Sequence, residues 1–161
     1  MNSLIRIGEI GFGTDTECLR TFVGSCVAIV LHDPTAKAAA LAHVQLPTSI
    51  NQPASDLGRY ADTAIPELIR QLRQKSNGVM SMVAHIAGGA DMFPVSSARS
   101  IGRLNIDAVK GLLSSHRIPV ITDDCGGTLA RRLVFDIPTG RLRIELLDPP
   151  PIVTRLQRGM H

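Results

Sequence analysis

A cysteine and a histidine lie on the two arms of a predicted hairpin, at a spacing that would let them exchange a proton. Cys26 directly precedes the apolar run 27–32, an Asp-Pro-Thr turn follows at 33–35, and 38–45 is the predicted returning strand. If the arms pair, Cys26 lies opposite position 43 or 44, where His43 stands. Opposed residues have Cβ atoms about 4.5–5.5 Å apart. The pair could then form a thiolate and an imidazolium, which is an activated nucleophile.

Spacing alone leaves a structural interpretation of the same two residues open. A register slip of one residue would move the side chains to opposite faces of the sheet. A cysteine in an apolar strand is usually a small buried hydrophobic residue, and a lone histidine on a strand is usually structural. Cys26 and His43 are therefore candidates at this point, and no more than that.

The rest of the chain predicts strands covered by two helices. Apolar residues recur on one face of 59–74 and of 101–115, as in amphipathic helices, and Pro66 predicts a kink or a later start in the first. This order favours an α+β layered sandwich with mixed, largely antiparallel sheets over a doubly wound fold. Further strands are predicted at 19–23, 79–87 and 118–122, with a hairpin formed by 131–136 and 141–147.

Composition narrows the class of protein. The chain has 161 residues, 44% of them hydrophobic, which fits one domain over 1–147 with an extended, Pro-rich tail at 148–161. Three cysteines without a C-x-x-C pair argue against a disulfide scaffold or a zinc module. Four Phe, one Tyr and no Trp argue against a nucleic-acid binder that stacks bases.

Targeting signals and charge add two expectations. Residues 1–10 lack the apolar core of a signal peptide, and the longest mostly apolar run, 21–31, is too short to cross a bilayer. We therefore expect a cytoplasmic protein without membrane insertion. Residues 99–161 carry ten basic and six acidic residues, a net charge of +4, against −1 for 1–98. This basic part suits an acidic partner or is simply a solvated face.

Several short blocks, in order, resemble one family. They read G-S-C-V-A at 24–28, A-H-V-Q-L-P at 42–47, G-R-Y-A-D-T-A at 58–64, I-A-G-G-A-D-M-F at 86–93 and D-C-G-G at 124–127. Each block is weak alone, but the ordered set over about 7–146 resembles CheD, the chemoreceptor glutamine deamidases of bacterial chemotaxis. The resemblance implies a layered α/β sandwich related to the catalytic domains of deamidating toxins.

The resemblance also implies a reaction and partners. In that family the cysteine of the G-S-C motif is the nucleophile and the histidine of H-x-x-L-P is its partner, which correspond to Cys26 and His43. The substrates are glutamine side chains on the cytoplasmic helices of methyl-accepting chemoreceptors. They become glutamate through a thioester, with release of ammonia and without a cofactor or metal. Family members also bind a CheC-type phosphatase, so a non-catalytic module that binds and regulates this phosphatase is the alternative function.

One position departs from the family pattern. Members carry a threonine six residues before the cysteine as a third active-site residue, whereas here Arg20 occupies that position and Thr21 follows it. On a regular strand this shift reverses the face, and a bulge or a deletion would restore it. We assign Thr21 the role of orienting His43.

Backbone N–H groups could stabilise the oxyanion of such a reaction. The candidate donors lie around Ser25, Gly88 and Gly89. The two glycines could equally serve only to permit a tight turn.

The remaining cysteines and histidines are weaker candidates for a role in catalysis. Relatives commonly have lysine at the position of His85, which makes it a poor rival base. A thiol redox protein is disfavoured because no resolving cysteine is evident, and a metal site of Cys26, His43, His85 and Cys125 matches no compact ligand motif. We expect structural roles for Cys18 and Cys125, and surface positions for His32, His116 and His161.

Overall fold

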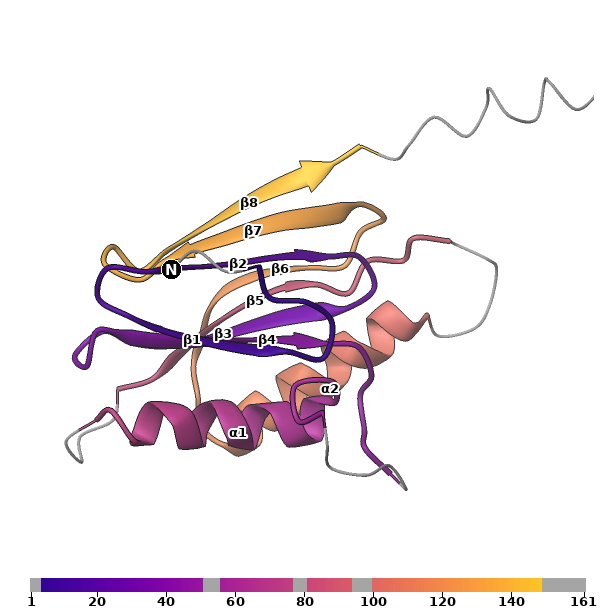
Figure 1. The fold of residues 1–161 in the computed structure, drawn as a ribbon. Coiled ribbons are helices and arrows are strands. Elements are labelled where there is room, and N and C mark those ends of the chain that lie inside the picture. The colour runs from indigo at the N-terminus through magenta and orange to yellow at the C-terminus, as the bar shows by residue number, and fades with distance from the viewer. Residues whose placement is uncertain (1–3, 51–55, 77–80, 94–99, 149–161) are drawn as a thin grey trace, which may run out of the picture.

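The computed structural model describes residues 4–50, 56–76, 81–93 and 100–148, and these form three layers (Figure 1). Two helices cover one face of a five-stranded sheet, and a three-stranded sheet covers its other face. Of the paired strands, only β5 and β6 run parallel, so the predicted α+β class with largely antiparallel sheets is confirmed. The larger sheet has the order β1 (Ile10–Thr14), β4 (Ala38–Val44), β3 (Val27–Asp33), β5 (Val83–Gly88), β6 (Val120–Cys125), and the smaller one β2 (Cys18–Val23), β7 (Ala130–Asp136), β8 (Arg141–Leu147).

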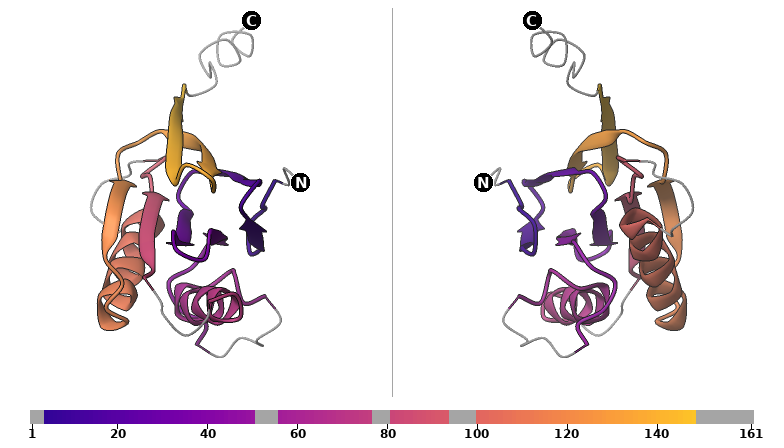
Figure 2. Two further views of the ribbon diagram at one scale, coloured as in Figure 1. Left: turned by 90° about the vertical axis from the view of Figure 1, so that its left-hand side faces the viewer. Right: turned by 90° about the vertical axis from the view of Figure 1, so that its right-hand side faces the viewer.

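The helices pack side by side beneath the larger sheet (Figure 2). Helix α2 (Ile101–Ser115) has the predicted bounds, and the Ser100 hydroxyl caps it by accepting the backbone N–H of Arg103 at 3.2 Å. Helix α1 (Ala61–Arg73) begins two residues later than predicted and continues through Pro66. No helix in the described part of the chain is long and apolar enough to span a bilayer.

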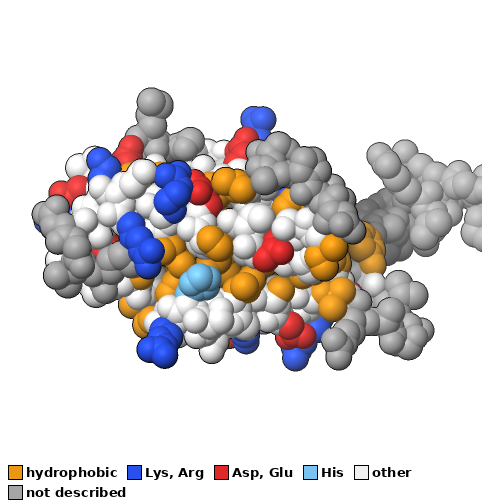
Figure 3. Space-filling view, turned by 90° about the horizontal axis from the view of Figure 1, so that it is seen from below, with side chains coloured by type: hydrophobic (Ala, Val, Ile, Leu, Met, Phe, Trp, Pro, Cys, Tyr) orange, Lys and Arg blue, Asp and Glu red, His pale blue; other side chains and the backbone are white. Residues whose placement is uncertain are grey.

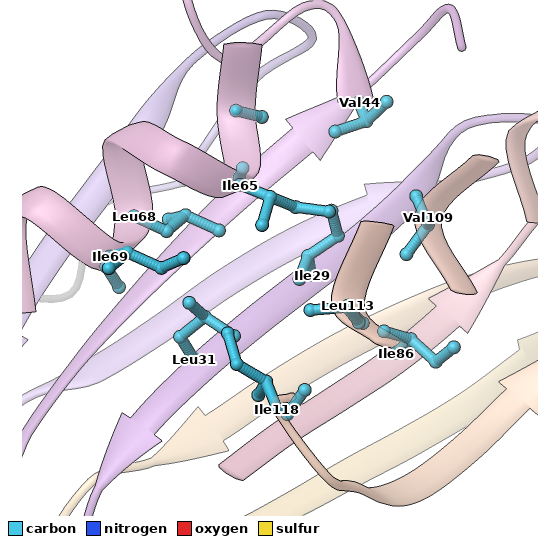
Figure 4. Packing of buried hydrophobic residues seen from close by; sticks show 14 of the residues in the cluster. Ile29, Leu31, Val44, Ile65, Leu68, Ile69, Ile86, Val109, Leu113 and Ile118 are labelled. Carbon is cyan, nitrogen blue, oxygen red and sulfur yellow. The ribbon is translucent and has the colours of Figure 1, made fainter. Parts of the chain in front are cut away.

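Strand β3 packs against the helices on one face and against the smaller sheet on the other. Its alternate residues Ile29 and Leu31 face the helices, where they pack among Ile65, Leu68 and Leu113 (Figure 4). The intervening residues face the smaller sheet. Because both faces of β3 are covered, every one of its residues is buried. This explains why its sequence is a continuous apolar run rather than an alternating one.

His32, which was predicted on the surface, lies in the layer between the two sheets. His32 is only 6% exposed, and its ring packs edge-on against Phe135 at 5.1 Å between centroids. The surface prediction is wrong because β3 is covered on both sides, so the His32 ring is shielded from water. His116 is exposed as predicted, and His161 lies outside the described residues, as does the predicted tail after Asp148.

The helical side of the molecule is a mixed surface. Figure 3 shows basic, acidic and apolar side chains interspersed over it. Several of these charges pair locally, such as Arg70 with Glu67 at 2.6 Å and Arg103 with Asp107 at 3.5 Å. Such pairs are typical of a solvated helix face.

The chain changes sheets just before its candidate nucleophile. Strands β2 and β3 follow each other in sequence, yet β2 belongs to the smaller sheet and β3 to the larger one. Residues 24–26 form the bend between them. This crossing places Cys26 at the seam between the two sheets.

Candidate active site

Cys26 and His43 line the same pocket at this seam, with a volume of about 620 Å³. The pocket is open to solvent on one side, and most of its wall is apolar. Both candidate side chains are buried, Cys26 directly before β3 and His43 near the end of β4. The two residues that the sequence spacing selected therefore line one pocket. The other lining residues are Leu4, Ile5, Arg6, Ile7, Phe22, Gly24, Ser25 and Met92.

The hairpin register differs from the predicted one. Ala28, and not Cys26, lies directly opposite His43, because four loop residues separate Asp33 from its partner Ala38. The last of these loop residues, Lys37, has a φ of 50°, which closes the longer turn. Cys26 precedes Ala28 by two residues and packs in the same cluster as Ala28. Both side chains line the same pocket, so the thiol and the imidazole lie on the same side of the larger sheet.

Thr21 contacts His43 from the neighbouring sheet. The hydroxyl of Thr21 lies 2.8 Å from Nδ1 of His43 and 2.6 Å from the backbone oxygen of Ile5. A hydroxyl has a single proton, which the carbonyl of Ile5 accepts, so the hydroxyl oxygen accepts the Nδ1–H of His43. The ring is thereby held as the Nδ1–H tautomer, and Nε2 keeps its lone pair.

The expected reversal of face at Thr21 does not occur. Residues of β2 pair one to one with those of β7, so no bulge lies within the strand. The bend at 24–26 interrupts the alternation of side chains between the two faces of a strand. The face of Thr21 in β2 therefore cannot be found by counting back from Cys26 as if both lay on one regular strand. Thr21 is fully buried and faces His43, while its neighbours Arg20 and Phe22 face solvent.

Burial favours the neutral form of both candidate side chains. Removal from water raises the pKa of the Cys26 thiol, and its own backbone N–H only partly offsets this. Burial likewise lowers the pKa of His43, against the opposing effects of the Ile5 backbone and the Glu9 charge. The resting site thus favours a thiol and an imidazole over the thiolate–imidazolium pair predicted from the sequence.

The two candidate glycines pack against the backbone of Cys26. The backbone N–H of Gly89 donates to the carbonyl oxygen of Cys26 at 2.8 Å, and the next N–H, of Ala90, donates to that of Gly24 at 2.9 Å. A Cβ on Gly88 would meet the Cys26 oxygen at 2.2 Å, so only glycine fits there. The prediction that Gly89 offers an oxyanion donor is wrong, because its N–H is already bonded. Of the three candidate donors, only Ser25 lines the pocket.

Sequence reasoning matched Asn105 to the family pattern but gave no role to its buried amide, which joins the two halves of the site. Asn105 is fully buried, and its Nδ2 donates to the carbonyl oxygen of Ser25 at 3.1 Å and to that of Gln45 at 2.9 Å. It therefore ties the bend before Cys26 to the end of the strand that carries His43. The signal was present in the sequence, since Asn105 interrupts the apolar face of its helix between Ile101 and Val109.

The other thiols and imidazoles lie away from this pocket. The Cys18 thiol contacts the Asp136 carboxylate at 3.4 Å, and burial raises the pKa of Cys125, which packs against the helices, to about 12. His85 Nδ1 contacts the Thr122 hydroxyl at 2.8 Å. Over the ranges that the structure describes, no three His, Cys, Asp or Glu side chains are grouped to hold a metal ion.

Known proteins are similar to this sequence over most of its length. Residues 45–146 match the model of the family described as CheD chemotactic sensory transduction. A probable chemoreceptor glutamine deamidase CheD of Methanococcus vannielii is 38% identical over 142 residues, covering 88% of this chain and 92% of the relative. The chemoreceptor glutamine deamidase CheD of Thermotoga maritima is 39% identical over 146 residues, covering 90% and 92%. The chain belongs to the CheD family.

Proposed function

We propose that this protein hydrolyses glutamine side chains of methyl-accepting chemoreceptors to glutamate and releases ammonia. Cys26 is the nucleophile and His43 its base. The observation that carries the proposal is that these two residues line one pocket, while Thr21 holds Nδ1 of His43 from the neighbouring sheet and leaves Nε2 free. The substrate class comes from the names of the relatives, which are chemoreceptor glutamine deamidases.

The reaction begins from the neutral pair. Nε2 of His43 takes the thiol proton as Sγ of Cys26 attacks the carboxamide carbon. The resulting oxyanion needs nearby donors, for which the backbone N–H groups of Ser25 and Cys26 are the nearest candidates. The imidazolium then protonates the departing amine, ammonia leaves, and a thioester remains.

Water completes the reaction. His43, neutral again, accepts a proton from a water molecule that attacks the thioester, and the proton returns to the Cys26 thiolate. One water molecule is consumed and one ammonia is released per glutamine. Thr21 accepts the Nδ1–H throughout, so the ring does not need to turn between the two half-reactions.

The wall of the pocket suits an amide better than an acid. Arg6 is the one described lining residue with a full charge, but it is exposed, where water weakens its attraction for a carboxylate, and the rest of the wall is mostly apolar. A neutral carboxamide enters such a pocket at a modest cost, whereas a carboxylate loses much more hydration. This difference favours the entry of glutamine and the departure of glutamate.

A chemoreceptor cytoplasmic fragment provides the test. After incubation with the protein, mass spectrometry should show a gain of about one dalton at particular glutamines, together with ammonia release. Cys26→Ala and His43→Ala should abolish both signals, while Cys18→Ala, which changes a thiol away from the pocket, should retain them. Release of ammonia by Cys26→Ala at the wild-type rate would show that the nucleophile is misassigned. If the wild type releases none, the alternative of a non-catalytic module that binds a CheC-type phosphatase is favoured.

A further inference from the structure

The side of the smaller sheet that faces away from the core is rich in arginine. Along β2, Leu19, Thr21 and Val23 are buried, while Arg20 and Phe22 are exposed. Strand pairing continues this alternation across β7 and β8, on the side of the molecule opposite the helices (Figure 1). We call this surface the outer face, and its charged and aromatic residues are Arg20, Phe22, Arg132, Asp136, Arg141, Arg143 and Glu145.

An exposed aromatic ring joins the outer face to the active-site pocket. Phe22 is 44% exposed, and the Arg132 guanidinium lies over its ring at 5.2 Å from the centroid. Glu145 holds this guanidinium through an ion pair of 3.0 Å. Phe22 lines the pocket that contains Cys26, and it also lines a groove of about 250 Å³ together with Arg20 and Arg132. A bound chain can therefore reach from the pocket onto the outer face without a break.

The outer face has a surplus of positive charge. It carries four arginines and two carboxylates, and one of these carboxylates, Glu145, already pairs with Arg132. In the described part of the chain, Arg20, Arg141 and Arg143 form no ion pair, although Arg143 feels the charge of Asp136. Among the described residues, the outer face thus has two more guanidinium groups than carboxylates.

The spacing of these arginines suits one kind of partner. Arg20 pairs with Val134, which pairs with Arg143, so two strand spacings separate the two arginines. This is about 10 Å across the sheet. An α-helix rises 1.5 Å per residue, so carboxylates about seven residues apart on one helix face match this distance.

We propose that the outer face is a docking surface for an acidic helical segment of the polypeptide substrate. The inference rests on the proposed function, which places the target glutamine in the pocket. Phe22 contacts an apolar residue next to that glutamine, and exposed Leu4 and Ile7 extend this apolar rim. Arg20 and Arg143 then pair with carboxylates further along the same segment, which selects acidic helices over neutral ones.

Binding measurements with matched peptides test the proposal. The protein is the full chain carrying Cys26→Ala, so that no turnover occurs. The probes are two fluorescently labelled helical peptides with one glutamine beside leucine, identical except that two glutamates seven residues apart are replaced by serine in the second. Fluorescence anisotropy should show about tenfold tighter binding of the acidic peptide, as expected for two exposed charge pairs. The preference should shrink between 50 and 300 mM salt, since exposed charges are screened.

Two double variants that change the net charge of the protein equally distinguish an effect of the outer face from an effect of net charge. Arg20→Glu with Arg143→Glu should abolish the preference for the acidic peptide. Arg73→Glu with Arg103→Glu, both exposed on the helices, should retain it. Circular dichroism of each variant checks that it is folded.

Each outcome decides a separate point. Equal binding of the two peptides, or an unchanged preference in the Arg20/Arg143 variant, overturns the docking surface. Ammonia release from a receptor fragment by the wild type is scored separately. A preference for the acidic peptide without ammonia release would therefore support the surface while contradicting the proposed reaction, and release without the preference would do the reverse.

Discussion

The hydroxyl of Thr21 lies 2.8 Å from Nδ1 of His43, although the two residues belong to different sheets. The contact joins the smaller sheet to the larger one beside the pocket that His43 lines. Since the same hydroxyl donates to the carbonyl of Ile5, it acts as an acceptor toward the ring and selects one tautomer. The packing of the two sheets thus also orients the proposed base.

Replacing Thr21 by valine removes this contact with almost no change in volume. We expect kcat for ammonia release to fall by about 10- to 100-fold, because His43 loses the acceptor that fixes its tautomer. The free energy of unfolding should drop by about 1–3 kcal/mol, since a buried carbonyl and a ring N–H lose their partner. Thr21→Ser keeps the hydroxyl and should recover most of kcat. A wild-type kcat in Thr21→Val would show that the contact does not orient the base.

The pH profile of kcat/KM should show an acid limb below the ordinary histidine value. Burial lowers the pKa of His43, so the ring remains an available base as the pH falls past about 6.5. Activity is then lost only when Nε2 takes up a proton at lower pH. Ammonia release measured between pH 4.5 and 8 tests this expectation. A midpoint at or above 6.5 would contradict it.

Alkylation of Cys26 in the free protein should be slow at neutral pH. Burial raises the pKa of its thiol, so the labelling rate should have its midpoint above the free-thiol value of about 8.5. Iodoacetamide labelling followed by mass spectrometry across pH 6–10 measures it, with partly buried Cys18 and Cys125 resolved as separate peptides. A midpoint near pH 6 would instead indicate the resting ion pair.

Asn105 should contribute to both stability and turnover. Asn105→Ala leaves the carbonyl oxygens of Ser25 and Gln45 without a donor, which should cost about 1–3 kcal/mol of unfolding free energy. It also releases the bend that positions Cys26, so kcat should fall by about tenfold or more. Asp107→Ala, on an exposed position of the same helix, is the control and should change neither quantity. If only stability falls in Asn105→Ala, the amide supports the fold and not the site.

Acid should destabilise the protein through His85. Burial lowers the pKa of this ring to about 4, below the value of about 6.5 in an unfolded chain. Between these values the unfolded state binds a proton that the folded state does not, so stability falls as the pH drops from 6.5 toward 4. At pH 5 the loss amounts to about 2 kcal/mol relative to pH 7.

Urea unfolding at pH 7 and pH 5 measures this loss. His85→Gln cannot titrate in this range, so its free energy of unfolding should fall by about 2 kcal/mol less between the two pH values. His116→Gln changes an exposed histidine and should behave as the wild type. The same loss in His85→Gln as in the wild type would rule out His85 as the source.

Much of this molecule follows from local patterns. The apolar spacing of α2 gives its bounds, and the turn at 137–140 joins β7 and β8 into the predicted hairpin. The choice of Cys26 and His43 as partners also came from spacing within one hairpin, reinforced by the family motifs. These features depend on residues that are close in sequence, so hydrophobic period and turn chemistry are sufficient to find them.

Other features were decided by contacts between distant segments. Strand period alone predicted the wrong face for Thr21, because the chain leaves one sheet and enters another at 24–26. The burial of His32 depends on Phe135, and Asn105 reaches two carbonyls that are 60 and 80 residues away in the chain. A local pattern predicts where a strand lies and how its side chains alternate. Which sheet it joins, and what covers that sheet, depends on the packing of the whole chain.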